Sequence, residues 1–73
     1  PGLEEAMNKG GDGFYSFKGK EEYEYKYNPN DDTWTVKKGG NVVATEKHDD
    51  WIGRKFSRAQ RKYFEEIKRT SSQ

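Results

Sequence analysis

Basic side chains gather in the last twenty residues of the chain, where their type and spacing could bind phosphate groups. Residues 54–73 carry seven Lys and Arg against two Glu, a balance of +5, whereas residues 1–53 carry seven Lys against eleven acids, a balance of −4. Lys and Arg contacts with phosphates release counterions, and this release drives non-specific nucleic-acid binding. We therefore predict a nucleic-acid-binding surface made of Arg54, Lys55, Arg58, Arg61, Lys62, Lys68 and Arg69. Two alternatives stay open: a solvated helix face with no ligand, and pairing of Arg54 and Lys55 with acids of the sheet.

A helix near the C-terminus must hold these charges in place. Ser57 is a natural N-cap, and Gln60 three residues later completes a capping box. The apolar residues that follow recur at helical spacing and form one stripe, made of Ala59, Tyr63, Phe64 and Ile67. We expect this stripe to face the core, which leaves the basic side chains on the solvent side.

Strands are predicted before the helix by alternation and by turn residues. In EEYEYKY the tyrosines Tyr23, Tyr25 and Tyr27 share one face of a strand, and charged residues share the other. Gly39-Gly40 lies between TWTVKK and NVVATEK and indicates a type I′ hairpin, and Gly19-Lys20 is a second candidate turn. The chain therefore folds back on itself at least twice.

The pairing of these strands follows from placing apolar residues on one face. This criterion gives five pairs, Tyr27–Asp32, Tyr25–Trp34, Tyr23–Val36, Val36–Val43 and Trp34–Thr45. A one-residue slip in the Asn28–Asp32 loop stays open. Tyr27 is nearest the turn, so we expect it to be the most exposed of the three tyrosines.

The pairing divides the sheet into a core face and an open face. The expected core face holds Phe14, Tyr23, Tyr25, Trp34, Val36 and Val43. The open face carries Tyr15, Phe17 and Val42 among charged residues, which predicts a protein-contact patch there.

The apolar face of the sheet and the stripe of the helix must both be buried, so each covers the other. The predicted fold is α+β: a small antiparallel β-meander of three to four strands with a C-terminal α-helix packed across one face. Seventy-three residues suit one small domain, which we place at residues 13–69. Residues 1–12 form an N-terminal segment, either a short helical turn over Leu3–Asn8 or disordered, and residues 70–73 form a frayed tail.

Composition and motifs argue against catalysis, metal binding and membrane insertion. The chain has no Cys, one His and no phosphate-binding glycine loop, so we expect no enzyme, no cofactor and no small-molecule substrate. Asn28, Asn30 and Asp32 match the first three ligands of an EF-hand loop, but Thr33 stands where Gly is required. A turn explains them, and no metal is predicted. No apolar run approaches the ~20 residues of a membrane span, and the absence of Cys favours an intracellular setting.

Two functions remain as hypotheses, and both describe a non-enzymatic binding module. The first is nucleic-acid binding through the basic helix face. The alternative is a protein–protein interaction or inhibitor domain that uses the open sheet face around Tyr15, Phe17 and Val42, or a sheet edge that accepts another strand. Salt separates the two, because phosphate contacts weaken steeply with salt and an aromatic contact does not. No motif in the sequence identifies a known family.

Overall fold

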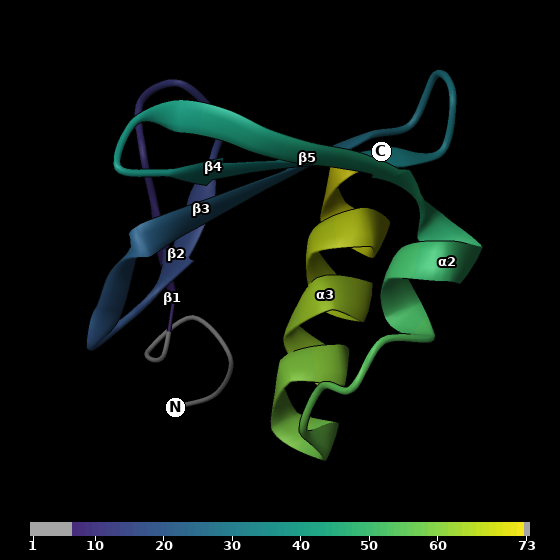
Figure 1. Ribbon diagram of the computed structural model, residues 1–73. Helices are drawn as coiled ribbons and strands as arrows, with labels where there is room; N and C mark the ends of the chain where they lie inside the picture. The colour runs from purple at the N-terminus through teal and green to yellow at the C-terminus, as the bar shows by residue number, and fades with distance from the viewer. Residues whose placement is uncertain (1–6, 73) are drawn as a thin grey trace.

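A five-stranded antiparallel sheet and two helices make up residues 7–72, the part of the chain that the computed structural model describes (Figure 1). The elements are β1 (Met7–Lys9), β2 (Tyr15–Phe17), β3 (Lys20–Asn28), β4 (Thr33–Lys38), β5 (Asn41–Lys47), α2 (His48–Ile52) and α3 (Arg58–Ser71). The sheet order is β1-β2-β3-β4-β5, so each strand pairs with the next along the chain. This confirms the predicted α+β meander with a C-terminal helix, with one strand more than the three to four expected.

The strand β1 lies where a helical turn was predicted. Most of the Leu3–Asn8 turn falls outside the described residues, but Met7 and Asn8 belong to β1 and pair with β2. An isolated helix of this length is marginal in water, whereas pairing with β2 satisfies backbone groups and buries the Met7 side chain. At the other end, α3 continues to Ser71, so residues 70 and 71 are helical and not part of a tail.

The turns of the meander are close to those predicted. Gly39 and Gly40 have φ of 58° and 85°, the left-handed backbone that a type I′ hairpin requires. The β3–β4 loop lies one residue further along than predicted, so Tyr27 pairs with Trp34 and not with Asp32. Because each partner moves by two residues, the face on which every side chain lies is unchanged.

A β-bulge in β5 moves one valine out of the predicted core. Val42 pairs with Lys37 and Ala44 pairs with Val36, so Val43 is the extra residue between them. As a result Val43 is 57% exposed, and Ala44 takes the place on the helix-facing side that was predicted for Val43. Alternation along the strand predicted the wrong residue because it assumes that no bulge interrupts the pairing.

The strand β2 presents its aromatic residues to the face opposite to the one predicted. Phe17 is buried in the core cluster and Tyr15 packs against the same cluster. The cause is a register shift in the β2–β3 pairing, which lies between Tyr15, opposite Tyr25, and Phe17. Phe14 was predicted in the core but is buried outside this cluster, with Lys37 Nζ 4.1 Å from its ring centroid.

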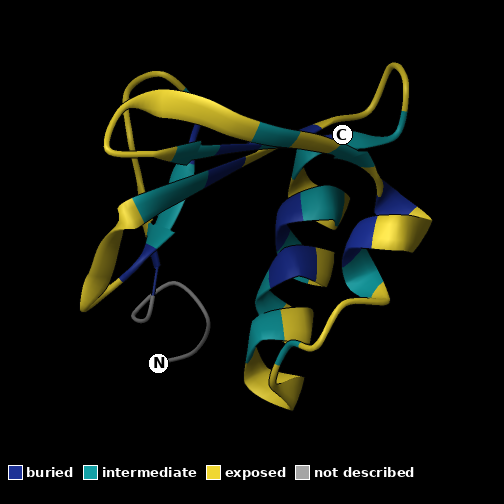
Figure 2. Cartoon of the chain, in the orientation of Figure 1, coloured by how far each residue is buried: buried dark blue, intermediate teal, exposed yellow. Residues whose placement is uncertain are grey.

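The core lies where α2 and α3 meet the middle of the sheet, as the buried positions in Figure 2 show. Trp34 is fully buried there, and its Nε1 donates a hydrogen bond to His48 Nδ1 at 3.0 Å. The Phe64 ring packs edge-on against Trp34, with 5.3 Å between the ring centroids. Tyr27 is only 5% exposed, so the prediction that it would be the most exposed tyrosine is wrong. Its hydroxyl donates to Asp32 Oδ1, which satisfies the polar end of a buried ring.

The helix α3 begins as predicted. The Ser57 side chain accepts from the Gln60 backbone N–H, and the Gln60 side chain accepts from the Ser57 backbone N–H, which confirms the capping box. Of the predicted stripe, Phe64 and Ile67 are buried, while Ala59 is exposed. No helix within residues 7–72 combines the length and the apolar character that crossing a membrane would require.

Candidate binding surfaces

A groove lined by charged side chains runs along the outer side of α3. Its lining consists of Arg58, Arg61, Lys62, Glu65, Glu66 and Arg69. These residues recur at helical spacing and therefore share one side of the helix. The structure thus brings four of the seven predicted cations together, and two glutamates lie among them.

Three of the seven predicted cations are paired with carboxylates of the chain itself. The pairs are Arg54–Glu46, Arg69–Glu66 and Lys68–Asp32, with 3.6 Å between Lys68 Nζ and Asp32 Oδ1. Hydrogen bonding to Glu46 raises the pKa of Arg54, and hydrogen bonding from Arg69 lowers the pKa of Glu66. A phosphate that approached these cations would compete with a carboxylate already in place.

The other four predicted cations differ from these three in their contacts within the described residues. Lys55, Arg58 and Lys62 form no ion pair with a carboxylate of the described residues. Arg61 donates from its guanidinium to the carbonyl oxygen of Arg54 at 3.3 Å. Within the predicted nucleic-acid surface, the cations that have no carboxylate partner among the described residues are therefore fewer than seven. They lie in the first half of α3 and at Lys55 before it.

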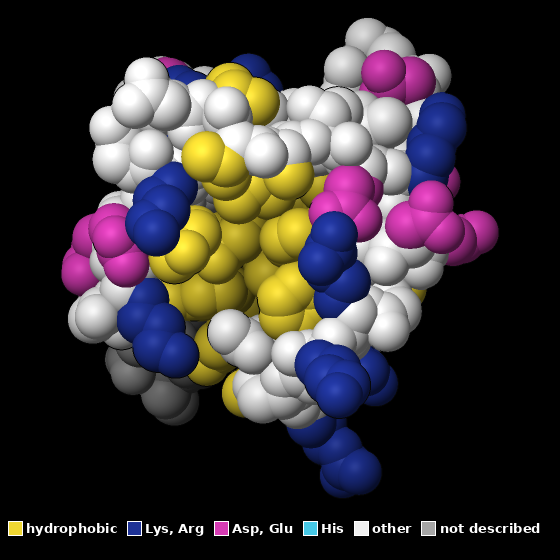
Figure 3. Space-filling view, in the orientation of Figure 1, with side chains coloured by type: hydrophobic (Ala, Val, Ile, Leu, Met, Phe, Trp, Pro, Cys, Tyr) yellow, Lys and Arg dark blue, Asp and Glu magenta, His cyan; other side chains and the backbone are white. Residues whose placement is uncertain are grey.

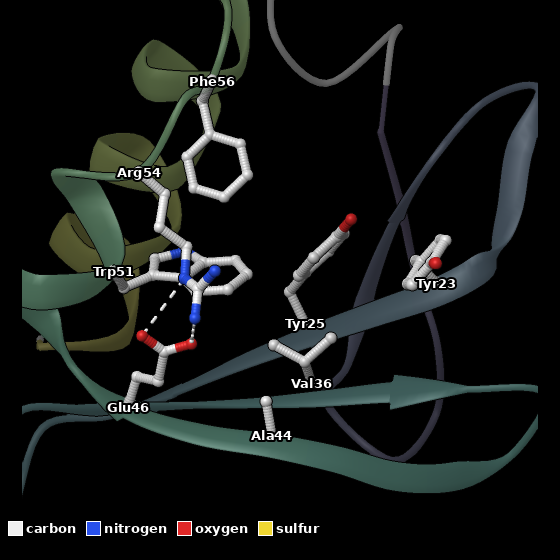
Figure 4. A pocket seen from close by; sticks show the side chains of 8 residues that line it. All are labelled: Tyr23, Tyr25, Val36, Ala44, Glu46, Trp51, Arg54 and Phe56. Atoms are coloured by element: carbon white, nitrogen blue, oxygen red, sulfur yellow. Dashed lines mark hydrogen bonds and ion pairs between the residues drawn. The ribbon is translucent and has the colours of Figure 1, made fainter.

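An apolar hollow of about 310 Å³ opens between the sheet and the segment that joins α2 to α3. Its lining consists of Tyr23 and Tyr25 from β3, Val36 from β4, Ala44 and Glu46 from β5, Trp51 from α2, and Arg54 and Phe56 from the joining segment. Figure 3 shows it as a depression lined by hydrophobic side chains, and Figure 4 shows the rings that border it. Ligand pockets span about 300–1,000 Å³, so this hollow suits an apolar side chain or a small apolar molecule.

The rim of the hollow carries cations that lie over its rings. The guanidinium carbon of Arg54 is 5.9 Å from the Trp51 ring centroid, and Lys38 Nζ is 5.4 Å from the Tyr23 ring centroid. Both distances fit cation–π contacts. Glu46 is the carboxylate of the lining, and it is held by Arg54, as the dashed lines in Figure 4 show. Trp51 Nε1 is buried and has no hydrogen-bond partner among the described residues.

The predicted protein-contact patch is not assembled on the open face of the sheet. Phe17 is part of the core and Tyr15 packs beside it, so neither lies on the open face. Val42 is 58% exposed on β5, an edge strand, next to the equally exposed Val43. The patch is therefore reduced to two valines at the sheet edge.

The residues that form the hollow were present in the sequence but had no pattern that marked them. Trp51 and Phe56 lie in HDDWIGRKF, a stretch that matches neither the strand period nor the helical stripe. The available signal was the presence of three large apolar residues, Trp51, Ile52 and Phe56, within nine positions that belong to no predicted element. Such residues need a partner surface, and here that surface is the end of the sheet beside α2.

Within residues 7–72, no three His, Cys, Asp or Glu side chains gather as a metal site would require. The EF-hand-like residues make turn contacts instead, because Asn28 Oδ1 accepts from the Asn30 backbone N–H at 3.0 Å. Asp32 has a left-handed backbone, with φ of 58°, and its carboxylate accepts from Tyr27.

No protein-family model, no curated protein and no solved structure matches this chain. The two surfaces must therefore be judged by their own geometry and chemistry.

Proposed function

We propose that the chain is a small non-enzymatic binding module, and that the apolar hollow holds an apolar side chain of a partner protein. The observation that supports this is the arrangement of Tyr25, Trp51 and Phe56, whose rings pack in or against the core and also line an opening at its edge. Covering apolar surface gains about 25 cal/mol per Å². Interface hot spots are buried side chains in well-packed pockets, and a hollow of this kind can receive one.

Protein binding comes before nucleic-acid binding in this proposal because of the charges on the helix. Three of the seven predicted cations already bind carboxylates, and two glutamates share the groove on α3. The intracellular setting belongs to the same proposal, since a chain without Cys needs no oxidising compartment.

The test is selection of random peptides displayed on phage against the wild-type chain and against two matched variants. Ala44→Leu extends a larger side chain into the hollow, whereas Thr45→Leu makes a similar change at an exposed position one residue along β5. We expect enriched peptides that bind the wild type and Thr45→Leu and lose at least about ten-fold in affinity on Ala44→Leu, since ten-fold corresponds to 1.4 kcal/mol. No enrichment, or peptides that bind both variants equally, would remove the hollow as the site. Circular dichroism of each variant checks that it is folded.

The second candidate function is nucleic-acid binding through the groove on α3. It is favoured by Lys55, Arg58 and Lys62, which have no carboxylate partner among the described residues. Contacts of this kind position a phosphate backbone without reading its sequence. The expected ligand is therefore any nucleic acid, bound with little sequence preference.

Fluorescence anisotropy of labelled single-stranded DNA, duplex DNA and RNA tests this second function. Binding should fall steeply between about 50 and 200 mM salt. The variant Arg58→Glu/Lys62→Glu should abolish it, while the matched variant Lys18→Glu/Lys20→Glu, with the same charge change in the β2–β3 turn, should bind nearly as the wild type does. No binding at the lower salt, or equal losses in the two variants, would exclude α3 as a phosphate-contacting face.

A further inference from the structure

We infer that the partner segment is acidic: an apolar anchor enters the hollow, and carboxylates beside it pair with Lys38 and Arg54 on the rim. This inference rests on the proposed function, because it requires that the hollow bind a protein. It adds the chemistry of the partner, which the apolar lining alone does not specify. The charges around the hollow carry the argument.

The cations on the rim face the opening from two sides. Lys38 lies over Tyr23 on β3, and Arg54 lies over Trp51 on α2. Figure 3 shows Lys and Arg side chains on two sides of the depression, with carboxylates beside them on both sides. Lys38 is exposed and pairs with no carboxylate of the described residues.

The carboxylates near the rim are engaged within the chain. Glu46 accepts from Arg54, with 3.1 Å between Arg54 Nε and Glu46 Oε1. Glu21 lies on the same side of β3 as Tyr23 by alternation, and its carboxylate accepts from the backbone N–H of Gly19 at 3.0 Å. Of the cations on the rim, Lys38 therefore has no ion-pair partner among the described residues, and a partner's carboxylate complements it.

The Arg54–Glu46 pair leaves part of Arg54 open to a partner. The Arg54 side chain is 56% exposed and the Glu46 side chain 20% exposed, so a partner's carboxylate can bind the open side of the guanidinium while Glu46 stays in place. Arg54 also covers the ring of Trp51, whose buried N–H has no acceptor among residues 7–72. When Arg54 turns toward the partner, this N–H can bind a carbonyl or carboxylate oxygen of the bound segment.

The test uses the peptides that the phage selection returns as dependent on the hollow. Each is synthesised as selected and as a twin in which every Asp and Glu is replaced by its amide, and both are titrated into the ¹⁵N-labelled full chain. We expect acidic residues beside the apolar anchor, and a loss of at least about ten-fold in affinity in the amide twin. The Trp51 indole N–H signal should shift on binding.

Variants of the protein locate the effect on the rim. Lys38→Gln should reduce the preference for the acidic peptide over its twin, and Glu46→Gln should strengthen binding of the acidic peptide because it releases Arg54. Glu24→Gln, on the other face of β3, is the matched control and should change neither. Two results would overturn this inference and leave the proposed function standing. The first is peptides that depend on the hollow but contain no Asp or Glu, and the second is an amide twin that binds as tightly as the acidic peptide. If no peptide depends on the hollow, the proposed function itself fails.

Discussion

The two ends of the helix-facing side of the sheet carry the same kinds of residue and differ in how they are covered. At one end Trp34 is fully buried against Phe64, and its N–H is satisfied by His48. At the other end the rings of Tyr25 and Trp51 border an open hollow, and the Trp51 N–H has no acceptor among the described residues. The difference shows that aromatic composition does not separate a closed core from an open hollow. Phe64 of α3 packs against the rings at both ends, so what separates the ends is the open space that lies beside Tyr23 and Tyr25.

Removing the ring at the closed end should have the largest effect of any single change. Trp34→Ala leaves a cavity under α3 and should cost about 3–5 kcal/mol of the free energy of unfolding, which is much of the stability of a small domain. Phe56→Ala, at the open end, should cost less than about 1.5 kcal/mol, because the ring is only half-buried. Urea unfolding followed by circular dichroism measures both. Equal losses would show that the two ends do not differ as described.

The hydrogen bond at the closed end can be tested without changing the packing much. His48→Leu fills a similar space but leaves the buried Trp34 N–H without an acceptor, which should cost about 1–3 kcal/mol. His48→Gln keeps an acceptor and should recover part of this loss. The comparison of the two variants by urea unfolding isolates the hydrogen bond, and similar stabilities for both would mean that the bond contributes nothing measurable.

The third and smallest effect is on how the free energy of unfolding depends on pH. Burial, together with the hydrogen bond to Asp32, raises the pKa of Tyr27 to about 12, above the ordinary tyrosine value of 10.0. Between these two values the unfolded chain loses the proton while the folded chain keeps it, so the free energy of unfolding should fall as pH rises. Tyr27→Phe should make this fall less steep. Urea midpoints measured from pH 9 upward test it, and an unchanged slope in the variant would contradict the assignment.

The acid side of the same contact has the opposite sign. The hydrogen bond from Tyr27, and then the charge of Lys68, lower the pKa of Asp32 below the ordinary aspartate value of 3.8. The stability that this carboxylate contributes is therefore present at neutral pH and is lost as pH falls through the lowered pKa. Asp32→Asn should remove this acid dependence while it keeps a residue that tolerates the left-handed backbone.

The features that sequence predicted correctly depend on neighbouring residues. The capping box of Ser57 and Gln60 needs only the first turn of a helix, and the Gly39-Gly40 hairpin needs only backbone freedom at two positions. The tyrosine face of β3 follows from a period of two, which survives a shift of the loop. Each of these signals is complete within a few residues of the chain.

The features that sequence missed depend on residues far apart in the chain. The face of Phe17 is set by an irregular pairing with β3, and the exposure of Val43 by a bulge opposite β4. The hollow requires the joining segment after α2 to stop short of covering the sheet beside Tyr23. None of these contacts between distant segments is encoded in a local sequence pattern. Composition and periodicity could therefore predict the fold class but not the candidate site.

The order of the strands also bears on how the chain folds. Each strand pairs with its neighbour in sequence, so every pairing in the sheet closes a short loop, which favours fast folding. The burial of Trp34 is different, because Phe64, which packs against it, lies thirty residues further along the chain. A chain emerging from the ribosome can therefore complete its hairpins first and bury Trp34 only once α3 has been made. During that interval its aromatic face is open to chaperones and to other nascent chains, and this is when the molecule is most prone to aggregate.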